Sequence, residues 1–117
     1  MIATELKRLW NACLYSWSGL CLSWKDAGAF RLELCLTPFV ILAALYWADS
    51  KTSLSIILVT WLFVLVTELI NTAIEAVTDL ACGGSYHLLA KKAKDCGSAA
   101  VTMAIAGFVL AWIILVF

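Results

Sequence analysis

Four oxygen-bearing side chains follow one side of an otherwise apolar segment. Glu68, Asn71, Glu75 and Asp79 recur at steps of three and four residues, so on a helix they fall within about 80° of one another. Carboxylates at membrane depth are costly and usually face a protein interior or a water-filled cavity. Carboxylate and amide oxygens suit Mg²⁺, which keeps several waters and bridges to phosphates. The alternative interpretation is hydrogen bonding between helices, together with a solvated helix end.

A second group of polar residues follows after a short polar segment and shares one face of the next helix. It consists of Lys91, Lys94, Asp95 and Ser98. A lysine at this place is a point charge suited to phosphate oxygens. For Lys91 and Lys92, the alternative is anchoring of the helix end at lipid headgroups.

No familiar nucleotide-binding motif competes with these two groups. The sequence contains no GxxxxGK[ST] loop, no dinucleotide-binding glycine pattern and no protein-kinase signature. A nucleotide would therefore have to bind through the carboxylates and lysines. Phosphoryl transfer requires few groups beyond these. A metal neutralises the phosphates, cations steady the developing charge, and a carboxylate accepts the proton of the attacking hydroxyl.

The composition indicates a membrane protein. The 117 residues are 64% hydrophobic and only 14% charged, whereas soluble domains are about 45–50% apolar. We expect one all-α membrane domain over residues 1–117, without room for a separate nucleotide-binding domain. The net charge of zero gives no electrostatic reason to expect nucleic acid. The five cysteines are odd in number and lack CxxC spacing, so we expect free thiols.

Periodicity and hydropathy predict one surface helix and three membrane spans. Residues 4–26 place apolar side chains, three tryptophans among them, opposite basic and polar ones, as in a helix that lies in the headgroup layer. A helix packed on the rest of the protein is the alternative. Residues 30–48, 54–77 and 97–117 are expected to cross the membrane, with their ends at its interfaces.

The basic residues predict the orientation in the membrane. Seven lysines and arginines precede the first span or lie between the second and third, whereas Lys51 is alone in the remaining loop. The positive-inside rule then puts the N-terminus and residues 79–96 in the cytoplasm and the C-terminus outside. Nearly all ionisable groups beyond the surface helix would gather at the cytoplasmic interface.

Several of these residues form motifs that resemble a known family. Residues 68–79 read ELINTAIEAVTD, and Tyr86-His87 and the segment AKDCGSAA at 93–100 follow. Together with residues 15–20 and 29–33, these motifs resemble the small prokaryotic diacylglycerol kinases over almost the whole chain. The resemblance implies a homotrimer in the bacterial inner membrane, with active sites shared between neighbouring chains. It also implies transfer of the γ-phosphate of MgATP to the hydroxyl of diacylglycerol, giving phosphatidic acid.

The resemblance also implies roles for individual residues. Glu68 would be the general base, and Glu75 would bind the metal. The ATP site would be formed by Arg8, Tyr15, Asn71, Glu75, Ser85, Tyr86, His87, Lys94 and Asp95. The lipid substrate would be bordered by Arg8, Ser16, Phe30, Arg31, Glu33, Trp47, Glu68 and Ser98.

The sequence departs from the family pattern at one metal-binding position. Ala27 stands where the family has a glutamate, and the neighbouring Asp26 would point about 100° away from it on a continuous helix. Gly84-Ser85 and Leu88 also replace positions that are usually acidic. Three alternatives therefore stay open: an undecaprenol kinase of the same fold, a non-catalytic membrane scaffold, and an ion carrier in which Glu68 and Glu75 relay cations.

Overall fold

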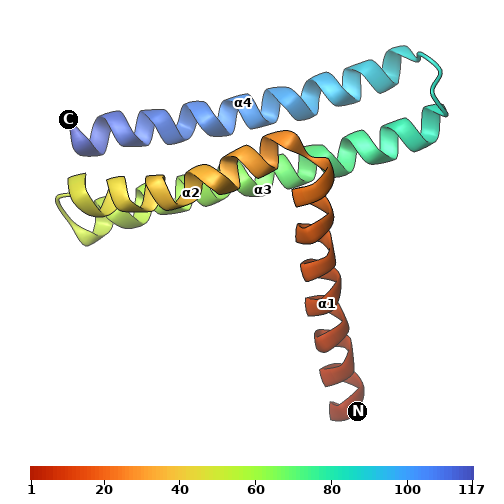
Figure 1. Cartoon of the computed structure of the whole chain (residues 1–117), viewed down its shortest axis with the longest axis horizontal. Coiled ribbons are helices and arrows are strands. Elements are labelled where there is room, and N and C mark those ends of the chain that lie inside the picture. Colours follow the sequence, from red (N-terminus) through yellow and green to blue (C-terminus); the bar gives the residue numbers. More distant parts are fainter.

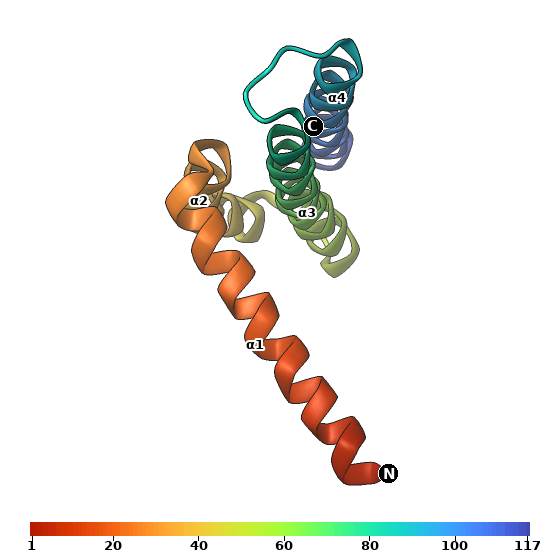
Figure 2. The same ribbon diagram turned by 90° about the vertical axis from the view of Figure 1, so that its right-hand side faces the viewer.

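The structure, a computed structural model, describes residues 1–117, which form four helices and no strands. They are α1 (Ile2–Asp26), α2 (Gly28–Trp47), α3 (Lys51–Cys82) and α4 (Leu88–Val116). In Figures 1 and 2, α3 lies between α2 and α4, while α1 leaves this group at a steep angle. The helices α2, α3 and α4 are long and apolar enough to cross a membrane. The expected all-α membrane architecture is confirmed.

Helix α1 makes little contact with the rest of its own chain. None of its residues is buried, and Trp10 and Trp17 are 66% and 69% exposed. In the structure, this helix therefore does not pack on the rest of the chain, which was the alternative interpretation. Its apolar face is free to lie among lipid headgroups, which stays a prediction.

Ala27 interrupts the chain between α1 and α2. Its backbone is extended, with φ −98° and ψ 102°, so the two helices meet at an elbow (Figure 2). Arg31 stabilises this elbow, because its Nη1 donates to the carbonyl oxygens of Trp24 at 3.3 Å and Lys25 at 3.5 Å. These carbonyls belong to the last turn of α1, where a helix leaves its acceptors without partners.

A polar link joins α2 to α3 within their apolar contact. Trp61 Nε1 donates to Thr37 Oγ1 at 3.0 Å, and this hydroxyl donates in turn to the carbonyl oxygen of Glu33. Helix α2 continues through Pro38. Only 12 of the 117 residues are buried, which leaves most apolar side chains for contact with lipid or a neighbouring chain.

The ends of α3 and α4 are defined by local caps. Ser50 Oγ accepts from the backbone N–H of Ser53 at the start of α3, and Gly83 ends the helix in the left-handed conformation with φ 54°. Helix α4 begins at Leu88, directly after the capping residue His87, whose Nδ1 accepts from the backbone N–H of Leu89 at 3.1 Å. The loop from Gly83 to His87 brings α4 back alongside α3 (Figure 1).

Candidate active site

A polar cavity of about 370 Å³ lies where the elbow, α3 and α4 come together. We call it the acidic cavity. It is lined by Asp26, Ala27, Gly28 and Ala29 from the elbow, by Glu68, Asn71, Thr72 and Glu75 from α3, and by Ser98, Val101 and Thr102 from α4. Three segments far apart in sequence therefore meet at the predicted base and the predicted metal ligand.

Glu68 is the most enclosed acidic side chain in this cavity. The residue is 6% exposed, and only its backbone carbonyl takes part in a side-chain hydrogen bond, from Thr72 Oγ1 at 3.0 Å. Its carboxylate has no hydrogen-bond partner and is close enough to Glu75 and Glu33 for electrostatic repulsion. A carboxylate placed in this way is free to accept a proton from a hydroxyl that enters the cavity.

Asn71 and Glu75 are held together on the same face of α3. Asn71 Nδ2 donates to Glu75 Oε1 at 3.2 Å, whereas Asn71 Oδ1 is buried and has no hydrogen-bond partner. Gly97 of α4 lies against this amide. A Cβ atom added at Gly97 would collide with Asn71 Oδ1 and lie 3.3 Å from Asn71 Cγ. The absence of a side chain at Gly97 therefore lets the two helices approach at the site.

The donor set of the acidic cavity fits a hard cation such as Mg²⁺. Its side-chain donor atoms are carboxylate, amide and hydroxyl oxygens, with no thiol or imidazole among them. No group of three or more His, Cys, Asp or Glu side chains is preformed for a metal. Mg²⁺ is commonly held by one or two carboxylates together with substrate phosphates and water.

One lysine of α4, Lys94, reaches across to the end of α3. Lys94 Nζ lies 2.7 Å from Asp79 Oδ1, and Lys91 pairs with Asp95 along α4. These lysines and acids line a cavity of about 360 Å³, whereas Ser98 lines the acidic cavity. The residues expected on one face of α4 are thus divided between two neighbouring cavities, because they lie at different heights along the helix.

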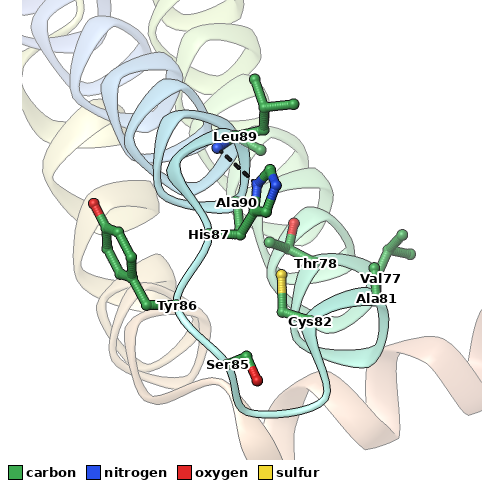
Figure 3. A pocket seen from close by; sticks show the side chains of 10 residues that line it. Val77, Thr78, Ala81, Cys82, Ser85, Tyr86, His87, Leu89 and Ala90 are labelled. Carbon is green, nitrogen blue, oxygen red and sulfur yellow. Dashed lines mark hydrogen bonds between the residues drawn. The ribbon is translucent and has the colours of Figure 1, made fainter.

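An adjoining cavity of about 520 Å³ lies beneath the loop between α3 and α4 (Figure 3). We call it the loop cavity. Its wall is mostly apolar, with Thr78, Cys82, Ser85, Tyr86 and His87 as its more polar residues. Apolar pockets with a few polar groups are typical of small-molecule sites. In Figure 3, Tyr86 points away from Thr78 and Cys82, and the hydrogen bond from Leu89 to His87 is drawn. Sequence reasoning missed Thr78 and Cys82, which no motif singled out.

A third hollow runs between α1 and α3. This α1 groove, of about 680 Å³, is lined by Ser16, Gly19, Leu20, Leu22, Ser23 and Asp26 from α1 and by Leu69, Thr72, Ala73 and Ala76 from α3. Because Asp26 and Thr72 line both the α1 groove and the acidic cavity, the two spaces adjoin. Ser16 is therefore the predicted lipid-binding residue that lies nearest to this junction along α1.

Other residues named from the sequence do not gather with these within one chain. Arg8 pairs with Glu5 on the outer part of α1, and Tyr15 is 73% exposed. Trp47 is the last residue of α2, and this end of α2 lies at the opposite end of the molecule from the loop between α3 and α4 (Figure 1). Phe30 is buried, Arg31 bonds to the end of α1, and Glu33 is buried with Oε2 unpartnered. All five cysteines are free, as expected.

Comparison with known proteins identifies the family of the chain. The profile of the family described as prokaryotic diacylglycerol kinase matches residues 14–116. A diacylglycerol kinase of Escherichia coli K12 is 39% identical over 113 residues, which cover 96% of this chain and 91% of that protein. Diacylglycerol kinases of Helicobacter pylori and Pseudomonas aeruginosa are 37% and 35% identical, over 94% and 93% of this chain and 85% and 88% of their own lengths. The chain belongs to the prokaryotic diacylglycerol kinase family.

Proposed function

We propose that this lipid kinase transfers the γ-phosphate of MgATP to the hydroxyl of a diacylglycerol, giving phosphatidic acid and ADP. One observation carries the proposal. Glu68 offers a buried carboxylate without a partner in a cavity that also contains Glu75 and adjoins an apolar groove. A base, a place for the phosphates and a path for a lipid therefore occur together in one family member.

The reaction needs one proton acceptor. The lipid hydroxyl oxygen forms a bond to the γ-phosphorus, while the bond from that phosphorus to the bridging oxygen of ADP breaks. The hydroxyl proton passes to the carboxylate of Glu68, which has no competing hydrogen bond. Ser98 lines the same cavity and can hydrogen-bond the glycerol part of the lipid.

Glu75 is the residue proposed to hold Mg²⁺. Asn71 donates to one oxygen of Glu75 and leaves the other free, so the carboxylate is oriented without being fully occupied. When bound, Mg²⁺ neutralises the charge of the β- and γ-phosphates. In this role Asn71 positions Glu75 and lies close to the phosphates.

The nucleotide is proposed to occupy the loop cavity and its neighbour. The apolar wall suits the adenine ring, and Ser85, Tyr86 and His87 lie at its polar edge. Lys94 and Asp95 stand beside it, and Lys94 can exchange its partner Asp79 for a phosphate oxygen.

We propose that Arg8 and Tyr15 reach this site from a neighbouring chain of a homotrimer. Within one chain, α1 points away from the loop between α3 and α4 (Figure 1), and neither residue lines the loop cavity. On the lipid side, the α1 groove brings Ser16 toward the acidic cavity. Arg31, Glu33, Phe30 and Trp47 are proposed to border the lipid from α2.

The proposed location is the bacterial inner membrane. The N-terminus and residues 79–96 would face the cytoplasm, where ATP is present, and the C-terminus would face the periplasm. The position of Lys91, Lys92 and Lys94 at the end that carries the loop cavity supports this orientation.

The decisive test is identification of the acceptor. Purified full-length protein in mixed micelles is incubated with radiolabelled ATP, Mg²⁺ and either dioleoylglycerol or undecaprenol. Labelled phosphatidic acid is expected. Labelled undecaprenyl phosphate alone would assign the other acceptor, and no labelled lipid in either reaction would contradict the proposed kinase activity. Proton flux into vesicles without ATP would instead indicate the ion carrier.

A further inference from the structure

The carboxylate of Asp26 takes part in no ion pair and no hydrogen bond. The ion pairs of the chain are Arg8–Glu5, Lys91–Asp95 and Lys94–Asp79. Asp26 ends α1 and lines both the acidic cavity and the α1 groove. Its carboxylate is therefore free at the junction of the two spaces.

The elbow allows Asp26 to line the same cavity as residue 27. On a continuous helix, Asp26 and residue 27 would point about 100° apart. The extended backbone of Ala27 ends the helix instead, and both residues line the acidic cavity. The bonds from Arg31 to the last carbonyls of α1 hold this arrangement.

The acidic cavity has no positive charge of its own. Asp26, Glu68 and Glu75 line it, and no lysine or arginine does. Glu68 is 6% exposed, without a partner for its carboxylate, and Glu75 repels it. Glu68 is buried, whereas Asp26 and Glu75 are exposed, and a buried carboxylate requires a compensating cation or a proton. The cavity therefore offers acidic side chains to a cation and supplies no cation of its own.

The geometry points to Asp26 as a ligand, together with Glu75, of the divalent cation that accompanies ATP. This inference rests on the proposed function. Two carboxylates from different segments, completed by phosphate oxygens and water, form a coordination shell of the kind that Mg²⁺ uses. Because no three acidic side chains are preformed as a metal site, the cation would bind together with the triphosphate rather than alone.

Cation binding tests this inference without relying on turnover. Full-length protein in detergent micelles is titrated with Mn²⁺ in the presence of a non-hydrolysable ATP analogue, and free Mn²⁺ is measured by electron paramagnetic resonance. Asp26→Asn is expected to weaken Mn²⁺ binding by about tenfold or more, since even indirect partners of a metal are worth roughly 10–100-fold. Asp26→Glu keeps the carboxylate and is expected to keep binding. Asp49→Asn, a matched change outside all these cavities, is expected to have no effect.

A rescue variant and the kinase assay separate the possible failures. Adding Ala27→Glu to Asp26→Asn returns a carboxylate to the same cavity and is expected to restore Mn²⁺ binding. Unchanged Mn²⁺ affinity in Asp26→Asn, with an unmodified protein that phosphorylates lipid, would overturn the role of Asp26 and leave the function intact. An unmodified protein that binds Mn²⁺ through Asp26 but phosphorylates no lipid would refute the proposed function alone.

Discussion

Replacing Gly97 with alanine places a methyl group where the amide oxygen of Asn71 lies. The new Cβ would collide with Asn71 Oδ1 and would also stand 3.3 Å from Cγ of the same side chain and 3.7 Å from Ile74 Cδ1. Asn71 cannot withdraw freely, because its Nδ2 donates to Glu75 Oε1 at 3.2 Å. Either α4 moves away from α3 or the bond between Asn71 and Glu75 breaks.

The expected change in the free energy of unfolding follows from two opposing contributions. Overpacking of a closely packed contact costs about 1–3 kcal/mol, whereas glycine-to-alanine in a helix interior contributes about 1 kcal/mol of stability. Gly97→Ala is therefore expected to lower the free energy of unfolding by about 0–2 kcal/mol. Displacement of Glu75 is expected to reduce phosphate transfer by roughly 100-fold, as small misplacements of catalytic groups do.

Gly107→Ala is the matched control on the same helix. No atom lies within 4 Å of a Cβ added there, so only the gain in helix stability remains. The difference between the two variants isolates the steric conflict, with an expected value of about 1–3 kcal/mol. Unfolding in detergent is followed by circular dichroism, and transfer is measured with dioleoylglycerol. Equal stability and equal activity of the two variants would refute the proposed contact between Asn71 and Gly97.

Two further changes test the ends of the helices. His87→Ala removes the acceptor that caps α4 and is expected to lower the free energy of unfolding by about 1 kcal/mol. His87→Asn keeps a capping side chain and is expected to keep most of that stability. Equal losses in the two variants would argue against the cap. Hydrogen bonds from Ser53, and then Ser50, lower the pKa of Asp49, so its stabilising effect is present above the unfolded pKa of about 3.9 and is lost as the pH falls through the lower, folded value. The stability difference between the unmodified protein and Asp49→Asn is therefore expected to shrink in that acidic range, and a difference that grows there would contradict this sign.

Periodic features of the structure could be predicted from the sequence. The apolar runs of α2, α3 and α4 and the stripe of Glu68, Asn71 and Glu75 follow from spacing alone. Side chains that recur at steps of three and four residues share one face of a helix. The acidic face of α3 was therefore predictable before any contact was known.

Contacts between distant segments could not be predicted in the same way. The conflict between Asn71 and Gly97 depends on how closely α3 and α4 approach, which no local pattern encodes. The predicted bounds 4–26 and 30–48 left a break between the two helices, but no proline or side-chain cap marked Ala27 as the residue with the extended backbone. Arg8 and Tyr15 lie on a helix without buried residues, and no contact within the chain places them at the site.

The carboxylate of Glu68 is the centre of this account, and one substitution tests it directly. Glu68→Gln keeps the size of the side chain and removes the proton acceptor, so phosphate transfer to dioleoylglycerol is expected to fall by about 10²–10⁴-fold. Mn²⁺ binding with the ATP analogue and the detergent-solubilised fold should be retained, and Asp49→Asn serves as the control carboxylate change. Full activity of Glu68→Gln in the radiolabelled assay would contradict the assignment of the acidic cavity as the site of phosphoryl transfer.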